Sequence, residues 1–218
     1  MPATGEVLSL LSGLFQAVGY FLYVRGTLRH EIVPNPTTWL LFAYDTTLLV
    51  LLHTTLGADP LILLLPAVCA SCSIGVAALS WARLGFYWPD EGLDQAAVVG
   101  CLGLTVGYAA LTVLADQGAI SSELRRGAYI AMLVFSNGST IVSFVPLLRS
   151  MRRHPASERP AAWLVWAVAY GLLLASTMLI HKWSEPELVL YPICNMTLHL
   201  AVAGLSLPAR RHLATTVP

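Results

Sequence analysis

Charged residues are scarce in this chain. Only 11% of its 218 residues are Asp, Glu, Lys or Arg, whereas 56% are apolar, and soluble domains carry about 25% charged residues. The mean hydropathy is +0.70. A chain with so few charged residues cannot form the polar surface of a soluble domain. It is also too apolar to be disordered. The composition indicates an integral membrane protein.

The chain also lacks a net charge and a disulfide pattern. Twelve Lys and Arg balance twelve Asp and Glu, so no basic field attracts nucleic acid. The four cysteines lie in apolar stretches rather than in the loops where a secreted disulfide scaffold places them. We therefore expect neither a nucleic-acid partner nor a disulfide framework.

Sequence motifs of catalysis and cofactor binding are missing as well. The chain contains no His-x-x-x-His and no Gly-x-Ser-x-Gly, which are signatures of metal and serine chemistry. Cys69 and Cys72 have a redox-type spacing, but they lie in an apolar helical stretch where small residues favour close packing. A retinal pigment needs a lysine in its seventh helix, but the only lysine of this chain, Lys182, lies outside the seventh apolar segment. We expect no enzyme activity, no cofactor and no metal.

Seven apolar stretches are long enough to cross a bilayer. A helix rises 1.5 Å per residue, so about 20 residues span a hydrocarbon core of roughly 30 Å. Six stretches carry no charge, and the second is interrupted only by Asp45. They cover residues 7–24, 32–58, 60–82, 95–115, 127–148, 160–181 and 188–209. The predicted fold class is an all-α integral membrane protein with seven transmembrane helices.

The distribution of arginines predicts the orientation in the membrane. With the N-terminus outside, nine of the twelve Lys and Arg fall on the inner side and three outside. Short loops rich in Lys and Arg stay in the cytoplasm. The inner residues are Arg25, Arg29, Arg83, Arg149, Arg152, Arg153, Arg159, Arg210 and Arg211. We expect a multi-pass protein of the plasma (bacterial inner) membrane, with an outer N-terminus and a cytoplasmic C-terminus.

Parts of the chain repeat. A shift of 124 residues aligns two copies of Arg-x3-Arg-His-x5-Pro-x2-Trp, which begin at Arg25 and Arg149. A shift of 126 aligns two copies of Val-Ala-x-Leu-Ser, at Val76 and Val202. This pattern predicts a three-helix repeat (7–82), a linker helix (93–116), a second three-helix repeat (127–208) and a cytoplasmic tail (209–218). One linker helix makes the repeats parallel, related by an axis along the membrane normal.

This 3+1+3 organisation resembles the SWEET and PQ-loop superfamily, as a divergent bacterial member. The resemblance rests on a basic loop after the first helix of each repeat and a proline at the entry to the second. In place of the Pro-Gln pair of that family, this chain has Leu22-Tyr23 and Pro146-Leu147. The resemblance implies a carrier of a sugar, amino acid or organic acid that works by alternating access. The superfamily also contains a sorting-signal receptor, so a non-transporting receptor or scaffold is the alternative.

Asp45 is the candidate proton-coupling residue. It lies seven residues into the second helix, about 10 Å from its inner end. An aspartate at a helix centre costs roughly 2.5–3.5 kcal/mol on insertion scales, so it usually faces a cavity or a partner. The alternative is a structural carboxyl group that holds the second helix to the first through Gln16 or Tyr20.

A substrate site is predicted at mid-depth between the two repeats. Asn195 and His199 share one face of the seventh helix, and their repeat equivalents, Cys69 and Ser73, share one face of the third. The alternative for these four residues is hydrogen bonding between helices, worth about 1 kcal/mol or less per bond. The remaining candidates are the cavity-lining residues Tyr44, Trp166 and Tyr170, the hinges Pro146 and Pro192, and the interfacial anchors Trp39 and Trp163. The expected partners are a small solute and the bilayer, and an oligomer is not required.

The orientation gives the first testable prediction. Alkaline phosphatase folds only outside the cytoplasm, so a fusion after Arg211 should be inactive and a fusion at Glu185 should be active. Enzyme assays on intact cells measure both. An active fusion after Arg211 or an inactive one at Glu185 would contradict the predicted topology.

Overall fold

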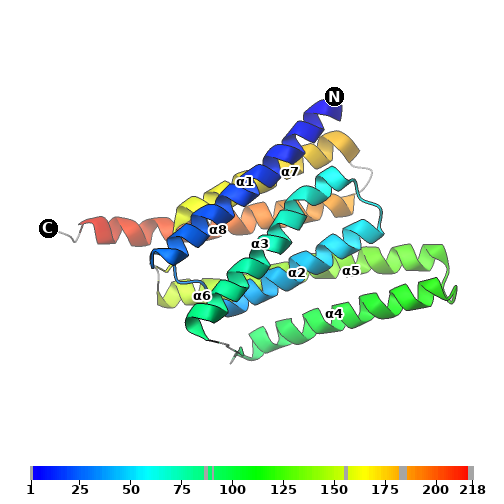
Figure 1. Ribbon diagram of the computed structural model, residues 1–218, viewed down its shortest axis with the longest axis horizontal. Helices are drawn as coiled ribbons and strands as arrows, with labels where there is room; N and C mark the ends of the chain where they lie inside the picture. Colours follow the sequence, from blue (N-terminus) through cyan, green and yellow to red (C-terminus); the bar gives the residue numbers. More distant parts are fainter. Residues whose placement is uncertain (1, 86–87, 90, 155–156, 182–185, 216–218) are drawn as a thin grey trace.

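The structure is a bundle of long helices (Figure 1). The computed structural model describes residues 2–85, 88–89, 91–154, 157–181 and 186–215, with the backbone alone at 2, 181, 186–187 and 208–215. Among these residues there are helices and no strands. The helices are α1 (Pro2–Leu28), α2 (Pro36–Thr55), α3 (Pro60–Leu84), α4 (Gly92–Asp116), α5 (Ser122–Ser143), α6 (Val145–Arg153), α7 (Pro160–His181) and α8 (Pro186–Thr215).

Short polar side chains begin several of the helices. Asn35 Oδ1 accepts a hydrogen bond from Thr38 N at 3.0 Å, and Asp59 Oδ1 accepts one from Leu61 N at 2.8 Å. Such caps satisfy backbone N–H groups that have no partner within the helix. A proline occupies the first position of α2 and of α3, where the missing N–H costs nothing. The loops therefore fix where α2 and α3 start.

The fifth predicted span is interrupted near its end. α5 stops at Ser143, Phe144 forms a turn, and α6 begins at Val145. Pro146 has no N–H to continue the ladder, and its ring displaces the preceding turn. The helix is therefore interrupted beside Pro146, whereas the role of Pro146 as a hinge stays a prediction. Pro192 lies within α8, which continues without a break.

The helices cross the molecule in alternating directions (Figure 1). α3 packs against α1 and α2, while α8 packs against α7 and α5. Two further contacts, α1 with α7 and α2 with α5, join these groups. α4 packs on α2 and α5 at the edge of the bundle. Helices distant in the sequence therefore enclose the centre, and α4 stays outside it.

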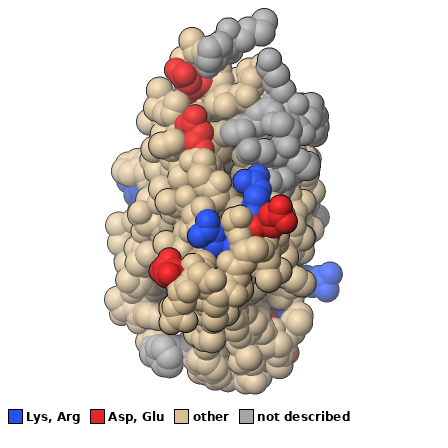
Figure 2. Space-filling view, turned by 90° about the vertical axis from the view of Figure 1, so that its right-hand side faces the viewer, with Lys and Arg blue, Asp and Glu red and all other residues tan. Residues whose placement is uncertain are grey.

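Charge differs between the two ends of the bundle. α1, α3 and α6 finish at the end that we call the basic end, which carries Arg25, Arg29, Arg83, Arg149, Arg152, Arg153 and Arg159. Figure 2 looks onto the opposite end, where a few acidic and basic side chains are scattered among uncharged ones. Lys182, predicted outside, lies beyond the described residues, as do the side chains of Arg210 and Arg211.

Six helices are long and apolar enough to cross a membrane. They are Ala3–Leu28, Pro60–Leu84, Gly92–Asp116, Ser122–Arg153, Pro160–Ile180 and Leu188–Leu207. α2, which corresponds to the second predicted span, is helical as expected but falls short of that apolarity, because it contains several threonines, Asp45 and His53. Most of its side chains are buried by neighbouring helices. The helix with the least apolar sequence is thus the one that needs the least lipid contact.

Close packing of α1 on α7 depends on a glycine. Trp166 of α7 lies against the backbone of α1, where its Nε1 donates to the Gln16 carbonyl oxygen at 3.1 Å. A Cβ atom at Gly19 would collide with the indole ring of Trp166. Gly19 therefore sets the distance between α1 and α7 at a contact whose two residues, Gly19 and Trp166, are 147 positions apart in the sequence.

Substituting this glycine tests the contact. Gly19→Ala should lower the free energy of unfolding by about 1–3 kcal/mol, because overpacking displaces a buried tryptophan. Gly75→Ala in α3 is the control, since no atom lies within 4 Å of its added Cβ, and alanine favours a helix by about 0.5–1 kcal/mol. Thermal melting in detergent compares them. A Gly19→Ala protein as stable as Gly75→Ala would show that the contact is loose.

Candidate functional site

A small cavity lies at the centre of the bundle. Its volume is about 10 Å³, which is roughly the space that one water molecule needs. Its walls come from α1, α2, α3, α5, α7 and α8, and from Phe144 at the break between α5 and α6. The lining residues are Tyr20, Trp39, Phe42, Asp45, Thr46, Cys69, Thr140, Phe144, Trp166, Tyr170, Asn195 and His199.

Most of the predicted site residues meet at this cavity. The structure places Asp45, Cys69, Trp166, Tyr170, Asn195 and His199 in its wall. Ser73 lies behind the wall, where its Oγ is 2.5 Å from the Tyr20 hydroxyl oxygen. The same hydroxyl donates to the Cys69 carbonyl oxygen at 3.2 Å. Helices that are far apart in the sequence thus bring these side chains to one place.

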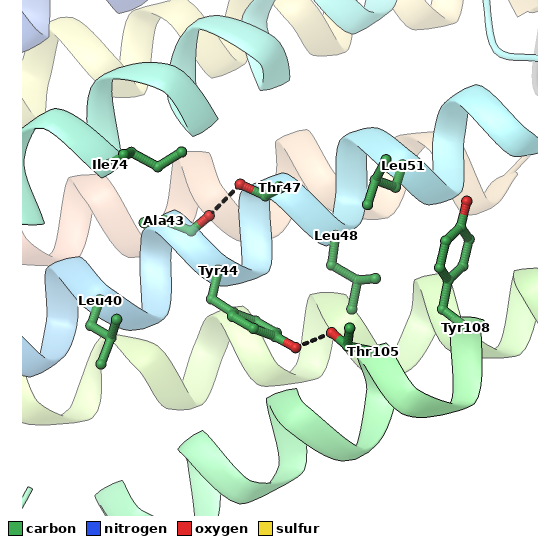
Figure 3. A pocket seen from close by; sticks show the side chains of 9 residues that line it. All are labelled: Leu40, Ala43, Tyr44, Thr47, Leu48, Leu51, Ile74, Thr105 and Tyr108. Carbon is green, nitrogen blue, oxygen red and sulfur yellow. Dashed lines mark hydrogen bonds between the residues drawn. The ribbon is translucent and has the colours of Figure 1, made fainter. Parts of the chain in front are cut away.

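Tyr44 is in a different place from the one predicted. Tyr44 is not among the residues that line the central cavity. It lines a groove of about 330 Å³ between α2, α3 and α4, which Figure 3 shows. Its hydroxyl donates to the Cys101 carbonyl oxygen at 2.8 Å and lies against Thr105 Oγ1. Tyr44 and the cavity residues Asp45 and Thr46 are adjacent in the chain, and adjacent residues on a helix point about 100° apart. The prediction that Tyr44 lines the central cavity is wrong.

Asp45 is buried, and both of its carboxyl oxygens accept hydrogen bonds. Its side chain is 1% exposed. Oδ2 accepts from Ser143 Oγ at 2.6 Å, and Oδ1 accepts from Ser139 Oγ at 3.0 Å and Cys101 Sγ at 3.2 Å. Three donors replace the water that a carboxylate loses inside a membrane. The partners Gln16 and Tyr20, which the structural alternative expected, are wrong, because Asp45 joins α2 to α4 and α5. A structural role for Asp45 stays an alternative.

Asn195 and His199 lie one turn apart in the wall. Asn195 Nδ2 donates to the Tyr191 carbonyl oxygen at 3.0 Å, and His199 Nδ1 lies 2.7 Å from the Asn195 carbonyl oxygen. A carbonyl only accepts, so Nδ1 carries the proton. No described residue pairs with Nε2 of His199, and the ring is surrounded by the aromatic rings of Phe144, Trp163, Trp166 and Tyr170, at centroid distances of 5.0–5.6 Å.

Buried tryptophans close the cavity toward the basic end. Trp39 and Trp163 are 1% and 0% exposed, so the prediction that they anchor the protein at the membrane interface is wrong. Trp39 Nε1 donates to the Tyr23 hydroxyl oxygen at 3.0 Å. An indole N–H inside a membrane needs an acceptor, and this cluster supplies one within the protein. The two tryptophans therefore pack inward.

Glu158 completes the cluster and was not singled out in the sequence. It is fully buried, and its two carboxyl oxygens accept from the Tyr23 hydroxyl and from Trp163 Nε1, each at 3.0 Å. Burial raises the pKa of Glu158 to about 8, while the bonds from Trp163 and Tyr23 lower it. One signal was present: Glu158 is the acid nearest to Pro160, the proline predicted to open a helix.

The loops before α2 and α7 join at the basic end. Val33 N donates to the Ser157 carbonyl oxygen at 3.0 Å. Arg159 Nη1 lies 2.6 Å from Glu31 Oε2 in an ion pair. With Tyr23 bonded to Glu158, three contacts link the loops and α1 across this end. The central cavity is therefore shut off from the basic end.

The comparisons with known proteins add no assignment. No family model, curated protein or solved structure matches the chain. Among the described residues, no group of three or more His, Cys, Asp or Glu could hold a metal ion. The geometry of the cavity and of the basic end therefore carries the functional argument.

Glu158 makes stability depend on pH. Between the ordinary pKa of 4.5 and the raised value of about 8, the folded protein keeps a proton that the unfolded chain has lost, so the free energy of unfolding falls as pH rises through this window. Glu158→Gln should flatten the melting temperature between about pH 5 and pH 8. Exposed Glu123, exchanged for Gln, is the control. Equal slopes in the wild type and in Glu158→Gln would contradict the buried, protonated state.

Proposed function

We propose that this chain is a small-solute membrane carrier in which two equivalent three-helix bundles rock around the central cavity. One bundle comprises α1 to α3 and contains the first predicted repeat, residues 7–82. The other comprises α5 to α8, with α5 and α6 together as its first helix, and contains the second predicted repeat, residues 127–208. α4, which contains residues 93–116, is the linker. This is the 3+1+3 organisation, and with it the resemblance to the SWEET and PQ-loop superfamily, that the sequence repeat predicts.

The helix contacts support equivalent bundles. Exchanging α1 with α5, α2 with α7 and α3 with α8 converts each main contact into another that the structure contains. The contact of α1 with α7 becomes that of α5 with α2, and the contact of α1 with α3 becomes that of α5 with α8. Exchanged helices also run in the same direction (Figure 1), as parallel repeats require.

The lining of the cavity is the observation that carries the proposal. Eight of its twelve residues form four pairs separated by the offsets of the sequence repeat, 124 residues for the first two helices of a bundle and 126 for the third. The pairs are Tyr20 with Phe144, Phe42 with Trp166, Thr46 with Tyr170, and Cys69 with Asn195. Each bundle therefore presents equivalent positions to a shared centre, where a solute bound between two moving halves would lie.

The shape of the cavity is that of an occluded state. About 10 Å³ leaves no room for a solute, so binding requires the bundles to separate. The cluster of Glu158, Tyr23 and the tryptophans, together with the Glu31–Arg159 ion pair, would open toward the basic end. Separation of α2 from α5 and of α1 from α7 would open the other. Alternating access by rigid-body rocking needs such a pair of gates around one site.

The chemistry of the wall suits a small solute with both polar and apolar faces. Aromatic rings offer flat apolar contact, and the side-chain oxygens of Asn195, Thr46 and Thr140 offer hydrogen-bond acceptors. Among the lining residues Asp45 alone is acidic and none is Lys or Arg. An ionised Asp45 disfavours an organic anion, so a sugar or an amino acid fits better than an organic acid.

Asp45 is the proposed proton carrier. Its repeat equivalent is Ala169, so one bundle alone supplies a carboxyl group to the cavity. The hydroxyl donors Ser139 and Ser143 lie on α5, in the other bundle. A change of charge on Asp45 therefore alters a contact between the bundles, which is how protonation would couple to their motion. We place the protein in the plasma membrane with its basic end in the cytoplasm.

Transport assays test this proposal. Purified protein in liposomes should exchange at least one solute from a panel of sugars and amino acids. Asp45→Asn should keep exchange but lose accumulation driven by a pH gradient, because the amide carries no removable proton. Asp116→Asn, at the exposed end of α4, is the control. Equal accumulation by wild type and Asp45→Asn would show that Asp45 is structural.

A receptor or scaffold on the same fold is the second candidate. The nearly closed cavity and the three hydrogen bonds that Asp45 accepts favour it, since both suit a static core. Cysteine labelling separates the candidates. Single cysteines at Thr46 and Thr140, in a background without the native cysteines, should react from each side in turn in a carrier. A protection pattern that no solute or pH changes would favour the scaffold.

A further inference from the structure

Two pockets at the basic end occupy equivalent places in the two bundles. The first, about 200 Å³, lies between the end of α1 and the start of α7 and is lined by Arg25 and Arg29. The second, about 260 Å³, lies between the end of α6 and the start of α2 and is lined by Arg149 and Arg153. The two arginine pairs are related by the offset of 124 residues. The pockets can therefore be compared position by position.

Acidic residues of the linker helix neutralise the second pocket. Arg149 Nη1 lies 3.1 Å from Asp94 Oδ2, and Arg153 Nη2 lies 3.5 Å from Glu91 Oε1. Asp94 is in the first turn of α4, and Glu91 directly precedes that helix. α4 packs on α2 and α5, beside this pocket alone. Two arginines thus face two carboxylates.

The first pocket has no such partner. Among the residues that the structure describes, no carboxylate pairs with Arg25 or Arg29, which are both exposed. Its one acid, Glu31, is already paired with Arg159. Three guanidinium groups therefore surround one carboxylate. In the first pocket, no described carboxylate takes the place that Asp94 and Glu91 take in the second pocket.

We propose that this first pocket binds the phosphate group of an anionic phospholipid. Guanidinium groups form paired hydrogen bonds with phosphate oxygens. The pocket lies at the end of a membrane-spanning helix, and apolar side chains, including Leu22, Ile32 and Ala162, form its other walls. A headgroup at this depth would leave its acyl chains beside α1 and α7. Basic pockets between helices on the cytoplasmic side are suited to acidic headgroups.

The lipid would also reach the contact that shuts the basic end. Arg159 lines the pocket and pairs with Glu31, and it follows Glu158, which is bonded to Tyr23. A bound phosphate competes with Glu31 for Arg159. The binding itself does not depend on the proposed transport activity, so it can be measured on a protein for which no solute is known.

Binding of short-chain lipids to the purified full chain in neutral detergent tests the proposal. Short-chain phosphatidylglycerol should bind, whereas phosphatidylcholine of the same chain length and inorganic phosphate should bind at least tenfold more weakly. The double variant R25Q/R29Q should lose at least tenfold in affinity for phosphatidylglycerol, or about 1.4 kcal/mol. R125Q/R126Q removes the same charge at the opposite end and should bind as the wild type does.

Four results would overturn the proposal. Equal losses in the two double variants would show an effect of net charge alone. Equal binding of phosphatidylcholine would show a groove that selects no acidic headgroup, and equal binding of inorganic phosphate would show a site for a free anion. Arg29→Gln alone, with a melting temperature equal to that of the wild type before lipid is added, replaces the double variant if the latter does not fold. An unchanged affinity in that protein would also overturn the proposal.

Discussion

A bilayer offers no hydrogen bonds, so each polar group within the helices must find its partner inside the protein. This constraint accounts for the centre of the structure. Asp45 is held by donors from two other helices, and the indoles of Trp39 and Trp163 reach Tyr23 and Glu158. Such bonds cross between segments that are far apart in the chain. They hold the bundle together at its core, while its outer helix faces carry exposed leucines and valines that suit lipid.

The sequence predicted what the bilayer imposes directly. Uncharged stretches gave the helices because a charge inside a membrane is costly, and Pro146 marked an interruption because it lacks an N–H. Asp45 stood out for the same reason of cost, but its partners did not, because serines of α5 carry no signal of what they face. Trp39 and Trp163 were wrongly predicted to be interfacial anchors, because a tryptophan near a helix end has the same place in the sequence whether its side chain points to the interface or inward. Glu158 was missed because its burial arises only when two loops meet.

In the proposed 3+1+3 organisation, α4 is the linker helix and breaks the symmetry that the sequence repeat would otherwise create. α4 packs on α2 and α5, so it supplies Cys101 to Asp45 and acidic partners to Arg149 and Arg153 alone. The equivalent arginines of the first bundle keep their charge available, and the equivalent of Asp45 is an alanine. On this proposal the two halves differ in what they contribute. The first half alone supplies a carboxyl group to the cavity, and it also carries the basic pocket in which the equivalent arginines have no acidic partner among the described residues.

The central claim is that two equivalent bundles move against each other around the cavity. Distances between spin labels measure this most directly, in a chain without its native cysteines and reconstituted in lipid. One pair, Leu28 with Arg152, marks the basic end, and the other, Thr55 with Leu179, marks the opposite end; each pair is related by the offset of 124 residues. Between pH 6 and pH 9, where Glu158 loses its proton, the first distance should lengthen as the second shortens. If the distance at each end stays the same between pH 6 and pH 9, the account is contradicted.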